Sequence, residues 1–76
     1  MAKYIYIYGK MGSEWLEEFG TLEAAKKYGD YNWNHQNDYD KKHCDYAYIL
    51  ESINPDPDAP NHLDGNPVKI YKDYND

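Results

Sequence analysis

Residues 44–53, C-D-Y-A-Y-I-L-E-S-I, decide the fold of this chain, because they form its longest apolar-rich run. Their side chains alternate in two sets, with Tyr46, Tyr48 and Leu50 in one and Ala47, Ile49 and Ile53 in the other. β-Branched and aromatic residues that alternate with a period of two are typical of a strand with two distinct faces. This segment therefore predicts the central strand of a sheet.

Segments near both ends of the chain repeat the alternation. Tyr4, Tyr6 and Tyr8 alternate with Ile5 and Ile7, and Val68 and Ile70 alternate with Lys69 and Tyr71. The three segments together predict a sheet with an aliphatic face and a tyrosine face. We expect the tyrosine face to carry Tyr4, Tyr6, Tyr8, Tyr46, Tyr48 and Tyr71.

The segment between these strands predicts a hairpin and then a helix. Two glycines bracket a turn over residues 9–13, which favours a second strand over residues 14–19. Thr21 is a suitable N-cap for a helix that begins at Leu22 and runs to about His35. Its apolar stripe is Leu22, Ala25, Gly29 and Trp33, and we expect residues 34–40 to form the exit loop.

The prolines of residues 54–61 exclude regular structure there, and the turn at residues 64–66 leads into a last strand at about residues 67–71. The expected architecture is a single α+β domain over residues 1–76, a ββαββ chain with an antiparallel sheet of three to four strands. One helix can cover only one face of a sheet. We expect it to cover the aliphatic face and to leave the tyrosine face open.

Composition and charge narrow the function classes. The 76-residue chain has 14 acidic residues, eight lysines, no arginine and a net charge of −6. Such a chain is poorly suited to binding nucleic acid or an anionic membrane, whereas a basic protein would attract it. The single Cys44, and the lack of a signal peptide or a membrane-spanning run, favour a soluble protein of the bacterial cytoplasm.

The residues that could carry chemistry are few. The potential soft metal ligands are His35, His43, Cys44 and His62, and no pair of them has a recognised zinc spacing. Asp45 follows Cys44 directly, and its negative charge disfavours a reactive thiolate. We therefore expect a protein without catalytic activity, metal or cofactor.

The acidic residues suggest a sharper hypothesis, in which carboxylates imitate the phosphates that a basic protein binds. The candidates are Glu14, Glu17, Glu18, Asp30, Asp38, Asp40, Asp45, Asp56, Asp58 and Asp64. The alternative is that an acidic surface only keeps a protein soluble.

Several short segments also resemble a group of small acidic proteins from Gram-positive bacteria and their phages. They are Asn32-Trp33-Asn34-His35, Asp40-Lys41-Lys42, Cys44-Asp45-Tyr46, Leu50-Glu51-Ser52, Asn54-Pro55-Asp56 and Asn61-His62-Leu63-Asp64-Gly65. That group has no assigned activity, so the resemblance implies a setting and no functional residue. In that setting small acidic phage proteins often inhibit host nucleases such as CRISPR effectors.

The resulting hypothesis is a non-enzymatic module that binds a basic, nucleic-acid-binding host protein, as an anti-CRISPR-like inhibitor or DNA mimic. Its acidic residues would attract the partner, and the tyrosines would anchor it. One alternative is a homodimeric structural protein whose tyrosine faces pack together. The other is a small metal- or ligand-binding module built on the histidines and the cysteine.

Overall fold

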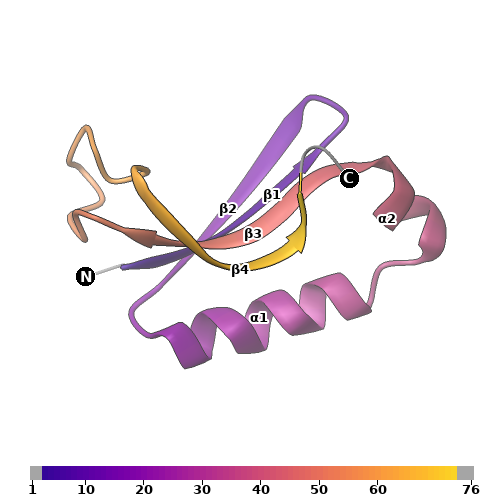
Figure 1. Cartoon of the computed structure of the whole chain (residues 1–76), viewed down its shortest axis with the longest axis horizontal. Helices are drawn as coiled ribbons and strands as arrows, with labels where there is room; N and C mark the ends of the chain where they lie inside the picture. Colours follow the sequence, from indigo (N-terminus) through magenta and orange to yellow (C-terminus); the bar gives the residue numbers. More distant parts are fainter. Residues whose placement is uncertain (1–2, 74–76) are drawn as a thin grey trace.

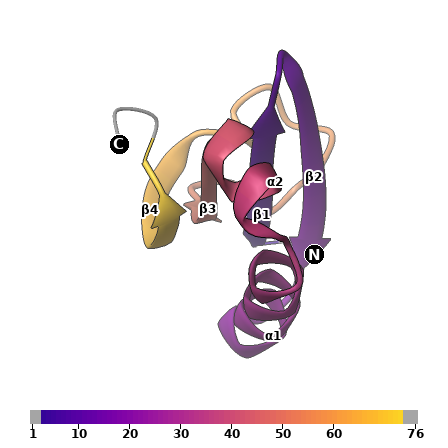
Figure 2. The ribbon, with the colours of Figure 1, turned by 90° about the vertical axis from the view of Figure 1, so that its right-hand side faces the viewer.

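The computed structural model describes residues 3–73, which form one antiparallel sheet and two helices (Figure 1). The elements in chain order are β1 (Tyr4–Lys10), β2 (Ser13–Phe19), α1 (Leu22–Asn34), α2 (Asp38–His43), β3 (Cys44–Ser52) and β4 (Gly65–Lys72). The strands lie in the order β2-β1-β3-β4, and α1 lies under one face of the sheet (Figure 2). The predicted α+β class and the ββαββ order are confirmed.

The hairpin of β1 and β2 depends on a two-residue turn. Met11 and Gly12 both have positive φ angles, 51° and 85°. Turns of this kind match the right-handed twist of the two strands that they join. The two strands consequently pair without a register shift, from Lys10 opposite Ser13 to Tyr4 opposite Phe19.

Helix α1 begins and packs as its sequence predicts. The Thr21 hydroxyl accepts a hydrogen bond of 3.2 Å from the Ala24 N–H, which caps the first turn. Ala25 and Gly29 are the buried residues of the stripe. A Cβ atom added to Gly29 would lie 2.7 Å from the hydroxyl oxygen of Tyr71. Glycine at this position therefore lets the helix approach the sheet closely.

The short helix α2 occupies part of the segment that we expected to be a loop. The Asn37 side chain caps it by accepting from the Asp40 N–H at 2.8 Å. At its other end, the Lys72 ammonium donates to the carbonyl oxygens of Lys41 and Lys42, at 2.9 and 3.2 Å. Both ends thus have partners, which stabilises a helix of only six residues.

The register between β1 and β3 overturns one prediction, that the tyrosines of these strands share a face. Tyr6 lies opposite Ile49, and Ile7 lies opposite Tyr48. Residues that lie opposite each other in antiparallel strands point to the same side of the sheet. The tyrosines of β1 therefore lie with Ala47 and Ile49 of β3, and Tyr46 and Tyr48 lie on the other side.

The sheet consequently has two mixed faces, which we call the helix face and the groove face. The helix face, under α1, carries Tyr4, Tyr6, Tyr8, Ala47, Ile49 and Tyr71. The groove face, on the opposite side, carries Ile5, Ile7, Tyr46, Tyr48 and Leu50. The exposed fraction of the side chains of Ile5 and Ile49 is 0%, so each face has a fully buried centre. The expectation that the helix covers all the aliphatic residues is wrong for Ile5, Ile7 and Ile70, which lie on the groove face, and for Ile53, which is exposed.

Candidate functional site

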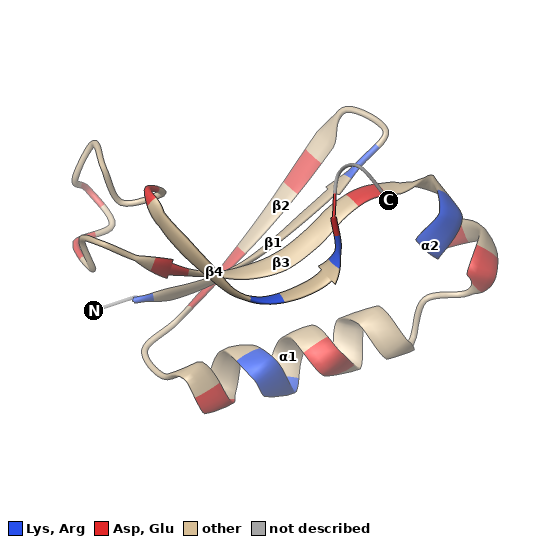
Figure 3. Cartoon of the chain, in the orientation of Figure 1, with Lys and Arg blue, Asp and Glu red and all other residues tan. Residues whose placement is uncertain are grey.

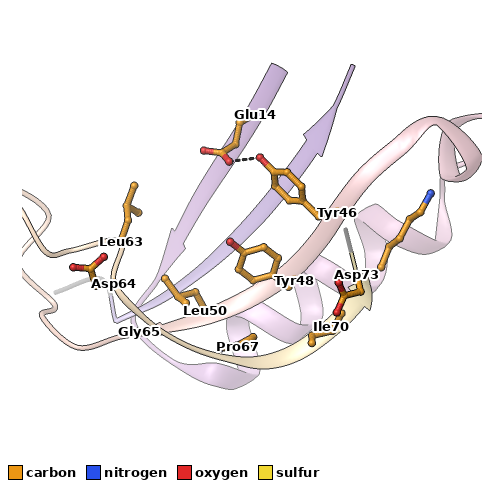
Figure 4. A pocket seen from close by; sticks show the side chains of 11 residues that line it. Glu14, Tyr46, Tyr48, Leu50, Leu63, Asp64, Gly65, Pro67, Ile70 and Asp73 are labelled. Carbon is orange, nitrogen blue, oxygen red and sulfur yellow. Dashed lines mark hydrogen bonds between the residues drawn. The ribbon is translucent and has the colours of Figure 1, made fainter. Parts of the chain in front are cut away.

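A groove of about 680 Å³ lies on the groove face, over β3 and β4 (Figure 4). Its lining includes the side chains of Tyr46, Tyr48 and Leu50 from β3 and of Pro67 and Ile70 from β4. Tyr48 lies opposite Ile70, and Leu50 lies opposite Pro67, so paired strand positions build this surface. The result is an aromatic and aliphatic floor.

Charged residues surround this floor. Glu14 of β2, Asp64 from the loop before β4 and Asp73 after β4 contribute three carboxylates to the lining (Figure 4). Lys72 is the one lysine in the lining, and its ammonium donates to the carbonyl oxygens of α2. The rim of the groove is therefore acidic.

Tyr46 is fixed at the edge of the groove by three neighbours. A Cβ atom added to Gly9 would lie 2.2 Å from the Tyr46 ring, so the ring lies directly over this glycine. The Tyr46 hydroxyl donates to the Glu14 carboxylate, and the ring centroid lies 5.9 Å from that of Tyr48. The hydrogen bond to Glu14 raises the pKa of Tyr46 to about 12, which keeps the hydroxyl protonated.

The loop at one end of the groove is held by the buried His62. Its Nε2 contacts the Glu18 carboxylate of β2, and its Nδ1 lies 2.8 Å from the Asn54 carbonyl oxygen. The Ser52 hydroxyl binds the carbonyl oxygen of His62. The Asn54 carbonyl and the Glu18 carboxylate raise the pKa of His62, because both stabilise the protonated ring. These contacts hold the loop against the sheet.

Apolar side chains remain exposed around the groove. Ile70 has an exposed fraction of 52%, and Leu16 and Leu63 are also exposed. Leu16 lies opposite Ile7, which places it on the groove face. Neighbouring exposed apolar residues with a polar border are typical of interaction surfaces.

Four of the predicted tyrosines lie on the helix face and not at the groove. Tyr6 has an exposed fraction of only 2% and donates to the Asn32 side chain of α1 at 2.9 Å. Tyr8 donates to the Gln36 side chain at 3.0 Å. Burial and these two partners give both tyrosines a structural role between sheet and helix.

The other two tyrosines on the helix face, Tyr71 and Tyr4, have partners in α1 and in β3. Tyr71 donates to the Asp30 carboxylate of α1, which also receives a hydrogen bond of 2.9 Å from Lys69. These donors, Tyr71 first, lower the pKa of Asp30. A hydrogen bond to Glu51 raises the pKa of Tyr4. Only Tyr46 and Tyr48 of the predicted tyrosine set line the groove.

The predicted acidic residues are distributed over both helices, two strands and the loop before β4. Glu14 and Glu18 lie on the groove face of β2, and Glu17 lies on its other side, next to Tyr6 and Tyr28. Asp38 and Asp40 lie in α2, Asp45 is an exposed residue of β3, and Asp56 and Asp58 lie in the loop before β4. Asp40 forms an ion pair of 2.8 Å with Lys10. Glu14 and Asp64 are therefore the two members of the predicted acidic set that line the groove.

Charge is segregated along the chain (Figure 3). Lysines lie in both helices, in β4 and at residues 3 and 10 of the N-terminal part. In contrast, β2 and the loop over residues 53–64 contain acidic residues and no lysine. The acidic part of the molecule thus adjoins the groove.

Sequence reasoning missed several lining residues, namely Leu50, Leu63, Pro67, Ile70, Lys72 and Asp73. The alternation of Val68 and Ile70 was a signal for β4, but only the pairing with β3 shows that Ile70 joins Tyr48.

The residues of the metal and thiol alternatives do not converge. Within residues 3–73 no group of three or more His, Cys, Asp or Glu side chains is placed to hold a metal ion. Cys44 is buried, and its Sγ lies 3.4 Å from the carbonyl oxygen of Gly9. Burial raises the pKa of the Cys44 thiol.

Comparison with known proteins adds no relative. No protein-family model matches the chain, and neither does a curated protein or a solved structure. Neither helix of the described part of the chain is long and apolar enough to cross a membrane.

Proposed function

We propose that this chain is a non-enzymatic module that binds a basic segment of a partner protein in its groove. The observation that carries the proposal is the combination of a tyrosine and aliphatic floor with an acidic rim. Lysine and arginine side chains have the complementary form, an apolar stem and a cationic head. The stem would lie on Tyr48 and Ile70, and the head would reach the rim carboxylates of Glu14 and Asp64.

Arginine suits this groove better than lysine. Its planar guanidinium stacks on aromatic rings and binds a carboxylate with two parallel hydrogen bonds. Tyr46 and Tyr48 offer two neighbouring rings, and Glu14 lies beside them. The groove therefore favours an arginine-bearing segment.

The charge of the whole chain supports the same class of partner. The net charge of −6 attracts a basic protein over a distance, and the lysine-free β2 and loop direct that attraction to the groove side. A surface rich in arginine and lysine is typical of a protein that binds nucleic acid. We propose that the chain inhibits such a protein by occupying the surface that otherwise binds phosphates.

Self-association is the competing possibility for the same face. The exposed Leu16, Leu63 and Ile70 favour it, since two copies could bury them together. The acidic rims of two copies would meet, however, and each chain carries a net charge of −6. Like charges that approach at an interface weaken it, so we favour the basic partner.

The test is capture of partners from a bacterial lysate on the immobilised chain, at low and at high salt. We expect basic nucleic-acid-binding proteins at low salt, with loss at high salt and competition by added DNA. Sizing of the free protein runs alongside. A stable dimer that captures no basic protein would overturn the proposal and favour self-association.

A matched pair of variants locates the binding surface. Ile70→Lys places a cation on the groove floor, whereas Ile53→Lys makes the same change at an exposed isoleucine outside the groove lining. We expect Ile70→Lys to weaken binding of the identified partner by about tenfold or more, the range typical of an interface anchor. Equal binding by both variants would exclude the groove.

A further inference from the structure

The two edges of the sheet differ in how well they are protected. The edge strand β4 contains Pro67 and Lys69, and its pairing with β3 has two register shifts. Proline, lysine and bulges are the features by which proteins block the addition of a further strand. In contrast, β2 contains neither proline nor lysine, and its seven residues pair with β1 in unbroken register.

An unblocked edge strand presents backbone groups to solvent. Alternate residues of an antiparallel strand direct their N–H and C=O groups to the same side, so about half of those in β2 point away from β1. Seven residues are enough to pair with an extended peptide. We propose that the outer edge of β2 binds an extended, basic segment of a partner protein as a fifth strand of the sheet.

The side chains of β2 determine which segment fits. Glu14, Glu17 and Glu18 are all exposed, and β2 itself contains no lysine. Glu14 accepts from Tyr46 and Glu18 contacts His62 of the loop, whereas the Glu17 side chain has no hydrogen bond or ion pair in the described structure. Glu14 and Glu18 project on the groove face and Glu17 on the helix face. Opposite charges that face each other across paired strands are stabilising. A strand with lysine or arginine on both of its faces therefore complements this edge.

A second copy of the chain is a poor occupant. Two β2 strands that paired antiparallel about Leu16 would place Glu14 opposite Glu18 and Trp15 opposite Glu17. Like charges directly opposite each other destabilise such a pair. The three glutamates therefore disfavour pairing of β2 with a second β2 in this register and favour a basic strand.

This inference rests on the proposed function for the charge of the partner, and it adds the way in which the partner binds. Glu14 belongs both to β2 and to the rim of the groove. A strand added beyond β2 would extend the groove face on that side. A basic partner could then bind the edge with its backbone and the groove with a side chain.

The test uses a synthetic peptide that repeats Lys-Lys-Val-Val, which places lysine on both faces of an extended strand. The control is the same peptide with glutamate in place of lysine. Amide hydrogen exchange of the whole chain is followed residue by residue by NMR. We expect the lysine peptide to slow exchange at alternate residues of β2 and to leave β4 unchanged. The glutamate peptide should do neither.

Two variants of equal charge change test the role of the edge carboxylates. Glu17→Lys alters β2 at a residue whose side chain has no hydrogen bond or ion pair in the described structure, and Asp58→Lys makes the same charge change in the loop before β4. We expect Glu17→Lys to weaken peptide binding about three- to tenfold more than Asp58→Lys does.

The outcomes separate the two proposals. Binding that slows exchange only around the groove would overturn the strand addition and leave the groove proposal standing. Failure of the lysine peptide to bind, or equal protection of β2 by the glutamate peptide, would also overturn the strand addition. The groove proposal fails independently, when Ile70→Lys and Ile53→Lys bind the captured partner equally.

Discussion

The two faces of the sheet use the same local arrangement for different purposes. On the helix face, Tyr71 lies against Gly29 and donates to Asp30. On the groove face, Tyr46 lies against Gly9 and donates to Glu14. In each case a tyrosine ring covers a glycine and a carboxylate accepts from the hydroxyl.

The difference lies in what each arrangement connects. Tyr71 joins β4 to α1, so it fastens one layer of the protein to the other. Tyr46 joins β3 to β2 across β1, within the sheet itself. The helix face is therefore closed by a second layer, whereas the groove face obtains its burial from its own side chains.

The largest expected effect comes from removing the buried centre of each face. Ile49→Ala and Ile5→Ala should each lower the free energy of unfolding by about 2–5 kcal/mol, because both side chains are fully buried. A loss of that size is a large part of the stability of a small domain, so the alanine variants can unfold. Ile49→Val and Ile5→Val should each cost about 1 kcal/mol, which leaves the protein folded and the loss measurable. Urea unfolding gives the values.

The isoleucine pair tests whether the groove face is a true core. Similar losses for Ile5→Val and Ile49→Val would show that the sheet is buried on both sides. A loss at Ile49 without one at Ile5 would mean that water reaches the groove face, and the comparison of two buried centres would be wrong. Ile53→Val, at an exposed residue, is the control.

The second largest loss of stability is expected from substituting the glycines under the two tyrosines. An added Cβ atom would lie 2.2 Å from the Tyr46 ring at Gly9 and 2.7 Å from the Tyr71 hydroxyl at Gly29. We expect Gly9→Ala to lower the free energy of unfolding by about 1–3 kcal/mol, as overpacking does. Gly29→Ala should cost less, since alanine favours the helix by about 1 kcal/mol relative to glycine.

A titration distinguishes displacement of the ring from a general loss of stability. Displacing Tyr46 from Glu14 should lower its pKa from about 12 toward the ordinary value of 10.0. Tyrosine absorbance across alkaline pH, compared with that of Tyr46→Phe, measures this change. Ile49→Val is the control, because it lowers stability at the buried centre of the helix face, whereas Tyr46 packs on the groove face. An unchanged pKa of Tyr46 in Gly9→Ala would show that the ring does not depend on Gly9.

Much of the fold could be predicted from local sequence patterns. The cap at Thr21, the stripe through Ala25 and Gly29 and the alternation of the strands each reflect a local physical preference. The helix α2 was missed although Asn37 precedes acidic residues and then lysines, which is the order that a helix dipole favours. Local signals thus identified most elements of the fold.

The assignment of the two faces could not be predicted in this way. Both sides of β1 are apolar, one with tyrosines and one with isoleucines, so hydrophobicity does not select the side that meets the helix. The tyrosines of β1 lie toward α1, where Asn32 and Gln36 accept from the hydroxyls of Tyr6 and Tyr8. Those partners are far away in the sequence. Of the candidate site, Glu14, Tyr46, Tyr48 and Asp64 were identified, whereas the remaining groove residues depend on how β4 pairs.

The smallest expected effect is a dependence of stability on pH at the loop that adjoins the groove. The pKa of His62 in the folded protein lies above its ordinary value of 6.5, because of the Asn54 carbonyl and the Glu18 carboxylate. Protonated His62 therefore stabilises the fold fully below about pH 6.5, and this contribution is lost as the pH rises through the raised pKa.

Thermal unfolding across this range should show the midpoint falling with pH in the wild type and falling less in Glu18→Gln. Glu14→Gln is the control, because it also removes a carboxylate of β2, but one that binds Tyr46 and not His62. We expect this variant to keep the pH dependence of the wild type. If Glu14→Gln and Glu18→Gln flatten the curve equally, the effect arises from the total negative charge of β2 and not from the contact that fixes the loop.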